Sequence, residues 1–314
     1  MESNPVSEAM PTTEHSRQEP VFILSPMRSY STVTIAILAG HPALYGFPEL
    51  LIFSGKTIGE IFSRILLRVA TGRPDARASG ICRAVAEVHE GSQQEDAIGR
   101  ALDWLMERTD WPTSRLFDHL AQFVYPRVPV EKSPDTVMND TNLSYCMAAY
   151  PNARYIHLTR HPVTAQRSVM EQLRFFTPKL SRKVLAARAA SVWYLSHLRI
   201  VRALEKVPED RWYRVRGEDL LATPEDSLTG LLTWLGLPTD SQTIARMLRT
   251  EDWTYAGTGP TGWLFGGDHK FMLAPALRPR AKDAALSFGS DLGLLEEMCA
   301  RMTSLAAYLG YSCD

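Results

Sequence analysis

The chain has 314 residues, enough for one large α/β domain or two smaller ones with a buried core. Its 34 basic and 35 acidic residues nearly cancel, so the overall charge favours neither a nucleic acid nor an anionic membrane as a partner. No run of about 18 apolar residues occurs, so we expect no membrane-spanning helix.

The N-terminal residues 1–20 are polar and lack the basic-then-apolar order of a signal peptide. We expect a disordered leader there and a cytoplasmic protein. The four cysteines form no C-x-x-C pair and have no histidine at metal-ligand spacing: Cys82, Cys146, Cys299 and Cys313. They indicate incidental thiols in a reducing compartment, and we expect no metal.

Folding is predicted to begin at the apolar run Val21–Leu24, bounded by prolines, which is typical of a buried parallel strand. A polar loop follows over Ser25–Ser31, and Thr32–Gly40 is predicted to be a helix packed on the sheet. This order of strand, loop and helix opens a βαβ unit.

The segment from about residue 50 to 125 shows helical periods, as in Ile58–Val69 and Glu95–Glu107, with a polar break at Thr71–Gly80. We interpret it as a helical insertion that caps the acceptor site. Five aromatic residues in it suggest an apolar pocket, although such residues more often belong to the core: Phe53, Phe62, Trp104, Trp111 and Phe117.

Strands and helices alternate again in the second half of the chain. We predict strands at Arg154–Thr159 and Trp212–Arg216. Helices are expected around Leu143–Ala149, from Pro162, over Ser181–Lys206, over Pro224–Leu235 with Gly236 as the stop, and over Leu292–Leu309. The prediction is one α/β domain over residues 21–314, with a parallel sheet flanked by helices.

Two groups of residues suit an anion. The loop between the first strand and helix carries Arg28, three hydroxyl side chains and free backbone N–H groups at a helix N-terminus: Ser29, Ser31 and Thr32. It is no Walker A loop. Arg160 ends a strand, and Ser168 follows after about two helical turns, so both can face one ligand beyond the sheet's carboxyl edge. Taken separately, each also fits a capped helix start or an ordinary strand-end arginine.

Together these residues resemble the PAPS-dependent sulfotransferases, which transfer a sulfuryl group from 3′-phosphoadenosine 5′-phosphosulfate. The matching segments occur in the family's order: Arg28–Thr32, His41-Pro42, Gly46–Glu49, Lys132–Pro134, Tyr150–Tyr155, Arg160–Pro162, Ser168, Glu218–Leu220 and Leu235–Pro238. The resemblance implies the P-loop-like sulfotransferase fold. The Gly-rich stretch Gly259–Phe271, with Ala39–Tyr45, is similar to sulfotransferase domains of polyketide assembly lines, which act on a carrier-bound hydroxyl.

The resemblance also implies roles for individual residues. The loop of Arg28, Ser29, Tyr30, Ser31 and Thr32 would hold the donor's 5′-phosphosulfate, and Arg160 with Ser168 would hold its 3′-phosphate. Lys270 and Arg278 would close over the nucleotide. The product is PAP, 3′-phosphoadenosine 5′-phosphate.

Sulfuryl transfer resembles phosphoryl transfer, so it needs a base for the attacking hydroxyl and cations for the leaving phosphate. Glu49 is the candidate base, and His269 is the alternative. Arg28 and Lys132 fit the cation role. Glu49 also suits a helix cap, Lys132 an exposed position, and His41 a structural turn.

The chain departs from the family pattern at four positions: Met27, Tyr30, His161 and Gly217. Tyr30 replaces the loop glycine and is strained if its φ is positive. Gly217 replaces the tyrosine before Glu218.

Tyr30 therefore keeps a second hypothesis open: a non-catalytic or alternative-donor relative that binds nucleotide or a carrier protein. A nucleotide kinase is a third hypothesis, which the missing Walker lysine opposes. Neither the acceptor nor the oligomeric state follows from the sequence.

Overall fold

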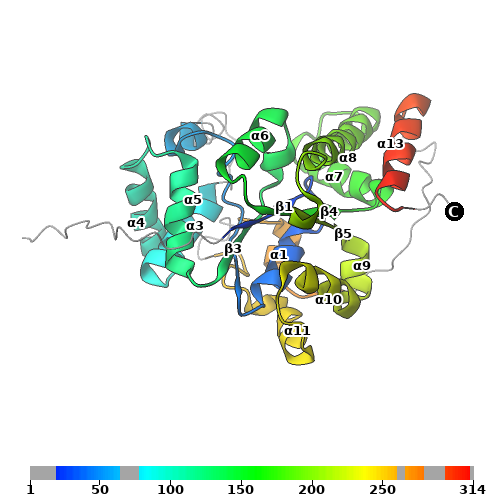
Figure 1. The fold of residues 1–314 in the computed structure, drawn as a ribbon. Helices are drawn as coiled ribbons and strands as arrows, with labels where there is room; N and C mark the ends of the chain where they lie inside the picture. The colour runs from blue at the N-terminus through cyan, green and yellow to red at the C-terminus, as the bar shows by residue number, and fades with distance from the viewer. Residues whose placement is uncertain (1–18, 64–77, 260–265, 279–293, 312–314) are drawn as a thin grey trace, which may run out of the picture.

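The computed structural model describes residues 19–63, 78–259, 266–278 and 294–311 (Figure 1). Most of the predicted leader, residues 1–18, lies outside the described residues. Its last residue, Pro20, already adjoins the sheet, because its carbonyl accepts a hydrogen bond of 3.0 Å from the Arg154 amide.

The sheet has five strands, all parallel, in the order β2-β3-β1-β4-β5. The strands are β1 (Val21–Leu24), β2 (Leu44–Gly46), β3 (Val128–Glu131), β4 (Arg154–Thr159) and β5 (Trp212–Arg216). The three predicted strands, β1, β4 and β5, are confirmed with their predicted bounds. β1 lies centrally and is buried throughout, as its unbroken apolar run indicates.

The two strands β2 and β3 were not predicted, and both are very short. Proline lacks the N–H that a strand needs for pairing, and Pro129 lies inside β3. β2 has only three residues, and Pro129 and Glu131 interrupt the apolar run in β3, so neither segment shows a clear strand pattern.

Helices cover both faces of the sheet (Figure 1). One face carries α6 (Asp140–Ala149), α7 (Pro162–Phe176), α8 (Arg182–Leu204) and α13 (Glu296–Tyr308). The other carries α1 (Ser31–Ala39), α9 (Gly217–Ala222), α10 (Pro224–Leu235) and α11 (Ser241–Met247). The predicted α/β class, a parallel sheet flanked by helices, is confirmed.

Local signals explain several helix bounds. Pro162 begins α7, where its missing N–H costs no hydrogen bond. Gly236 ends α10 in the left-handed conformation with φ 71°. The amides of Gly236 and Leu237 then donate to the carbonyls of Thr233 and Leu232, which closes the helix end.

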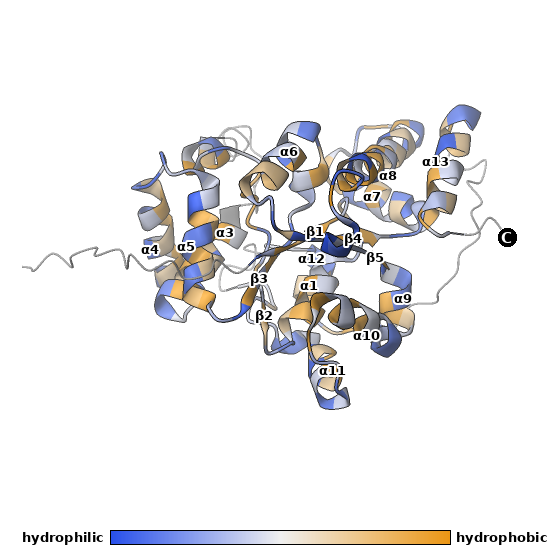
Figure 2. Cartoon of the chain, in the orientation of Figure 1, coloured by the Kyte–Doolittle hydropathy of each residue, from blue (hydrophilic) through white to orange (hydrophobic). Residues whose placement is uncertain are grey.

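Between β2 and β3 the chain contains the helices α3 (Ala78–Glu90), α4 (Glu95–Met106) and α5 (Thr113–Val124), and residues 58–63 are also helical. Figure 2 shows hydrophobic and polar residues alternating along α4 and α5, as expected for helices that bury one face. The predicted helix Ile58–Val69 is helical over residues 58–63 and otherwise lies outside the described residues. The predicted break at Thr71–Gly80 extends three residues too far, because α3 begins at Ala78.

The remaining described elements are short: η1 (Pro134–Val137), η2 (Glu209–Arg211), η3 (Thr250–Asp252) and α12 (His269–Leu273). Every helix within the described ranges is too short or too polar to cross a bilayer.

Parallel strands bring their carboxyl ends to a single edge of the sheet. The segments that leave this edge begin at Ser25 after β1, Phe47 after β2, Lys132 after β3, Arg160 after β4 and Gly217 after β5. This edge therefore gathers the residues that the sequence singled out.

Candidate active site

The loop between β1 and α1 ends at a helix N-terminus that has no side-chain cap. Tyr30 occupies the N-cap position without capping, and the first turn contains no acidic residue. The first N–H groups of a helix have no partner within it and carry the positive end of its dipole. The neighbouring Ser29 is fully buried, and its hydroxyl makes no hydrogen bond within the described part of the chain. This arrangement suits an anion.

Arg28 connects this loop to α7 and α12. Its Nε donates a hydrogen bond of 3.0 Å to Ser168 Oγ, and its guanidinium forms an ion pair with Asp268. Burial alone would raise the pKa of Asp268, but the charge and hydrogen bond of Arg28, the Lys270 amide and the Lys132 charge together lower it below its usual value. Any anion that binds Arg28 must therefore compete with the Asp268 carboxylate.

Arg160 follows β4 and is almost completely buried. Its guanidinium donates to the Arg28 carbonyl at 2.6 Å and to Thr164 Oγ1 at 3.1 Å. Its own carbonyl accepts a hydrogen bond of 2.9 Å from the Trp193 indole. Arg160 is thus held from three directions beside the loop that contains Arg28.

A buried lysine after β3 joins the first turn of α1 to the segment that follows β2. Lys132 Nζ donates to Thr32 Oγ1 at 2.8 Å and to Glu49 Oε1 at 2.5 Å. The Lys132 side chain is 1% exposed, which excludes a surface role, whereas that of Glu49 is 25% exposed. A buried cation thus fixes a carboxylate that solvent can reach.

Glu131 stabilises the backbone that follows Glu49. One of its carboxylate oxygens accepts hydrogen bonds from the Ser133 hydroxyl and from the Leu50 amide. Burial raises the pKa of Glu131 to about 7. The Ser133 hydroxyl in turn accepts a hydrogen bond of 2.9 Å from the Leu51 amide, so this pair orders the backbone just after Glu49.

Glu218 stabilises the backbone of the turn between β4 and α7 in a similar way. It accepts hydrogen bonds from the His161 amide at 3.0 Å and from the Tyr311 hydroxyl at 3.1 Å. Burial raises the pKa of Glu218. Through the His161 amide, Glu218 anchors the residue that follows Arg160.

The glycine-rich stretch Gly259–Phe271 also contacts Thr32 and Glu49, although its residues 260–265 lie outside the described residues. The Asp268 amide donates to Thr32 Oγ1 at 2.9 Å, and the Glu49 amide donates to the Gly266 carbonyl at 2.8 Å. His269 and Lys270 are exposed, and Lys270 Nζ pairs with Glu171 of α7 at 2.7 Å.

A family model for the sulfotransferase family matches residues 20–241, more than half of the chain. The chain belongs to this family. The matched residues include every strand of the sheet and the sequence motifs from Arg28 to Pro238. No curated protein matches the sequence.

Solved structures similar to this sulfotransferase agree with that assignment. The sulfotransferase domain from the Synechococcus PCC 7002 olefin synthase has 26% sequence identity and a TM-score of 0.73, covering 96% of this chain and 98% of that one. The sulfotransferase domain from the curacin biosynthetic pathway shares the fold at 23% identity and a TM-score of 0.76, covering 95% and 99%. A sulfotransferase of Mycobacterium avium is more distant, with 15% identity, a TM-score of 0.53 and coverage of 94% and 78%. The resemblance to biosynthetic sulfotransferase domains is confirmed.

Most of the predicted site residues of this sulfotransferase form one contact network: Arg28, Tyr30, Thr32, Glu49, Lys132, Arg160 and Ser168. Ser29 and Ser31 are buried in the same loop. The Lys270 amide donates to Asp268, whereas its side chain pairs with Glu171, and Arg278 is exposed. His41 is structural, because its ring bonds the Ala43 amide and the Pro238 carbonyl.

Sequence analysis missed Asp268, Glu131 and Thr164 as parts of this site. Asp268 had a usable signal, since an aspartate just before a short helix commonly caps it, and here it accepts from the Lys270 amide. The others had no local signal.

Tyr30 has the positive φ that sequence analysis marked as strained, at 65°. Such a conformation costs about 1–3 kcal/mol in a residue with a side chain. The Tyr30 ring lies under the Arg160 guanidinium, whose carbon is 4.2 Å from the ring centre. The ring also lies against Gly217, where an added Cβ would come within 2.5 Å of Tyr30 Cδ2.

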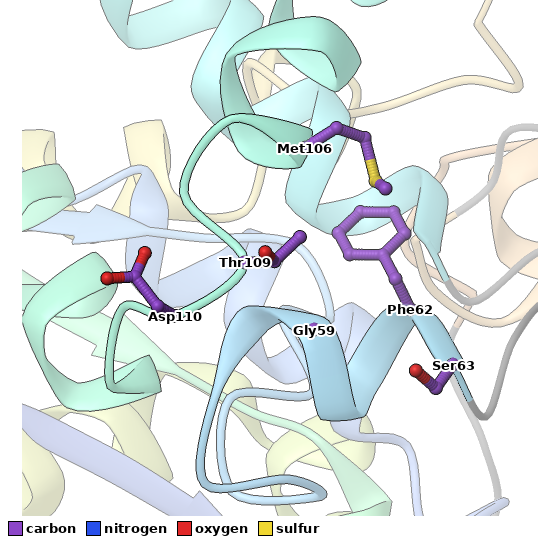
Figure 3. Close-up of a pocket in the computed structure, with 6 residues that line it drawn as sticks. All are labelled: Gly59, Phe62, Ser63, Met106, Thr109 and Asp110. Atoms are coloured by element: carbon purple, nitrogen blue, oxygen red, sulfur yellow. The ribbon is translucent and has the colours of Figure 1, made fainter.

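A pocket of about 390 Å³ lies in the predicted acceptor cap (Figure 3). The helical residues 58–63 and the turn after α4 line it, and Phe62 faces Met106 across it. Of the five aromatic residues proposed for an apolar pocket, Phe62 lines this one. Phe53 and Phe117 belong to the core, and Trp104 and Trp111 pack together at the edge of the helical segment.

Proposed function

We propose that the protein transfers a sulfuryl group from PAPS to a hydroxyl of a small-molecule or carrier-bound, polyketide-like acceptor. The donor half of the proposal is supported by three features that meet at the carboxyl edge of the sheet: a helix N-terminus that Tyr30 does not cap, the buried Ser29 hydroxyl, which has no partner among the described residues, and two arginines. Such a set of fixed donors and cations fits a ligand with two anionic groups.

In this proposal the loop of Arg28, Ser29, Tyr30, Ser31 and Thr32 binds the donor's 5′-phosphosulfate, and Arg160 and Ser168 bind its 3′-phosphate. PAPS supplies the activated sulfuryl group and leaves as PAP. Arg28 and Lys132 place positive charge beside the phosphate that becomes the leaving group, which lowers the barrier without a metal.

Glu49 is the proposed general base. Its ion pair with buried Lys132 fixes one carboxylate oxygen, while its partial exposure lets an acceptor hydroxyl approach. His269 is the alternative candidate for the general base. It is exposed at the start of α12, and its neighbour Asp268 contacts Arg28.

The acceptor half of the proposal rests on two observations. The similar domain from an olefin synthase belongs to a biosynthetic enzyme. The end of α7 and the start of α8 also expose a basic and aromatic surface, here called the α7–α8 tip: Arg174, Phe175, Phe176, Lys179, Arg182 and Lys183. Such a surface suits an acidic partner that carries the acceptor. Residues 50–125 then form the acceptor cap, and the reaction takes place in the cytoplasm.

The deciding experiment is a calorimetric titration of the protein with PAP, with AMP and ATP as comparison ligands. We expect micromolar binding of PAP, with weaker binding of AMP because AMP lacks the 3′-phosphate. Arg160→Ala should weaken PAP binding at least about tenfold and leave AMP binding nearly unchanged.

Turnover is then measured with PAPS and a β-hydroxyacyl acceptor. Glu49→Gln should keep PAP binding and lower kcat by about 10² or more. If the folded protein prefers ATP or ignores PAP, the alternative-donor or non-catalytic hypothesis replaces this proposal.

A further inference from the structure

The ring of Tyr30 contacts two parts of the chain that are both held in place. One is the Arg160 guanidinium, at 4.2 Å from the ring centre. The other is the backbone of Gly217, the first residue of α9, which lies close to Cδ2 and Cε2 of the ring. A tyrosine in the left-handed conformation needs such enclosing contacts, because its backbone alone disfavours φ 65°.

Gly217 has no room for a side chain while this ring is present. An added Cβ would lie 2.5 Å from Tyr30 Cδ2 and 3.2 Å from the Thr159 carbonyl oxygen. The backbone cannot retreat easily, because the next residue, Glu218, is tied to the His161 amide and to Tyr311. The glycine at 217 is therefore required by the ring at 30.

Arg160 is equally restrained on its side of the ring. Its guanidinium donates to the Arg28 carbonyl and to Thr164 Oγ1, and it stacks on the Tyr30 ring. A guanidinium over the face of an aromatic ring is held by the ring's quadrupole, so the ring helps to fix the plane of the guanidinium.

We infer that Tyr30 is a positioning residue that orients Arg160 for a 3′-phosphate, and that Gly217 makes this position of the ring possible. The two positions depart from the family pattern in opposite senses, with an aromatic residue in place of glycine at 30 and glycine in place of tyrosine at 217. They are thus one coupled change, which preserves the donor site. This inference rests on the proposed function for its ligand, but not for the packing of the ring.

The packing is tested by a double-mutant cycle in urea unfolding. Gly217→Ala should destabilise the wild-type protein clearly, whereas in a Tyr30→Gly background the same change should have little effect. If Gly217→Ala alone fails to fold and the double variant folds, the coupling is also supported. Equal effects of Gly217→Ala in both backgrounds would overturn it.

The positioning role is tested by the ratio of PAP to AMP affinity. Tyr30→Leu keeps bulk but lacks the aromatic face, so it should weaken PAP binding about fivefold more than AMP binding. Tyr30→Phe keeps the face and should bind PAP within about twofold of the wild type. An equal loss for PAP and AMP in Tyr30→Leu would show a merely structural role. If the wild type binds neither ligand, the proposed function and this role fall together, and the unfolding cycle still decides the packing.

Discussion

At the scale of single residues, Glu131 gives the clearest pH prediction. Burial raises its pKa to about 7 from an ordinary value of 4.5, so between these values the folded protein binds more protons than the unfolded chain. The stability that this carboxyl contributes is present below pH 4.5 and is lost as pH rises through 7. Glu131→Gln stays neutral and still accepts from Ser133 and Leu50, so its free energy of unfolding should rise relative to the wild type between pH 5 and 8.

Urea unfolding of both proteins at pH 5, 6, 7 and 8 measures this difference. The buried pair His157 and His197 has lowered pKa values and makes both proteins less stable as pH falls below 6.5, so its effect cancels in the comparison. A difference that does not change with pH would contradict the prediction.

At the scale of elements, α3 and the late glycine-rich stretch position Glu49 through direct backbone contact. A Cβ on Gly80 of α3 would lie 1.8 Å from the Glu49 carbonyl oxygen, and one on Gly266 would lie 2.9 Å from Gly80 Cα. Gly80→Ala should therefore displace Glu49 from Lys132, lower kcat at least about tenfold and destabilise the fold by about 1–3 kcal/mol. Steady-state kinetics and urea unfolding check both effects.

Gly99 of α4 provides the matched control, because an added Cβ there meets no atom within 4 Å. Gly99→Ala should leave kcat unchanged and stabilise the helix by up to about 1 kcal/mol. Similar kinetics for the two alanine variants would rule out the proposed role of Gly80.

At the scale of the whole molecule, charge is unevenly distributed although the totals nearly cancel. No acidic residue lies between Glu171 and Glu205, and within this stretch the α7–α8 tip exposes 82% of Phe175 and 59% of Phe176. Phe175 follows Ser168 by two helical turns on the same face of α7, about 10 Å along its axis. An acidic carrier docked at the tip would therefore lie close to the proposed donor site.

Reversing the charge of the tip tests this arrangement. Lys179→Glu with Lys183→Glu should raise KM for a carrier-bound acceptor about tenfold at low salt, and the effect should fade as salt screens the charges. KM for the same acyl chain on a small thiol and the affinity for PAP should not change. Lys206→Glu, just beyond the far end of α8 and about 30 Å from the tip, is the control. Equal effects on free and carrier-bound acceptors would contradict docking at the tip, and tight binding to anionic vesicles would indicate a membrane contact instead.

Local sequence signals determined much of the fold. The apolar run of β1, Pro162 at the start of α7 and Gly236 at the end of α10 each act within a few residues, so their elements have nearly the predicted bounds. The anion-binding character of the Arg28 loop was also predictable, because backbone N–H groups, hydroxyls and a cation follow one another in the chain.

Only the tertiary structure decided which of these groups meet. Lys132 and Glu49 are 83 positions apart, and Arg28 and Asp268 are 240 apart, so no local pattern pairs them. The parallel sheet brings Lys132 and Glu49 together because it places the carboxyl ends of distant strands at one edge. Asp268 reaches the same edge at the start of α12. The same packing shows how Tyr30 is accommodated: from the sequence it was a strained replacement for glycine, and in the fold its ring occupies the space that Gly217 leaves open.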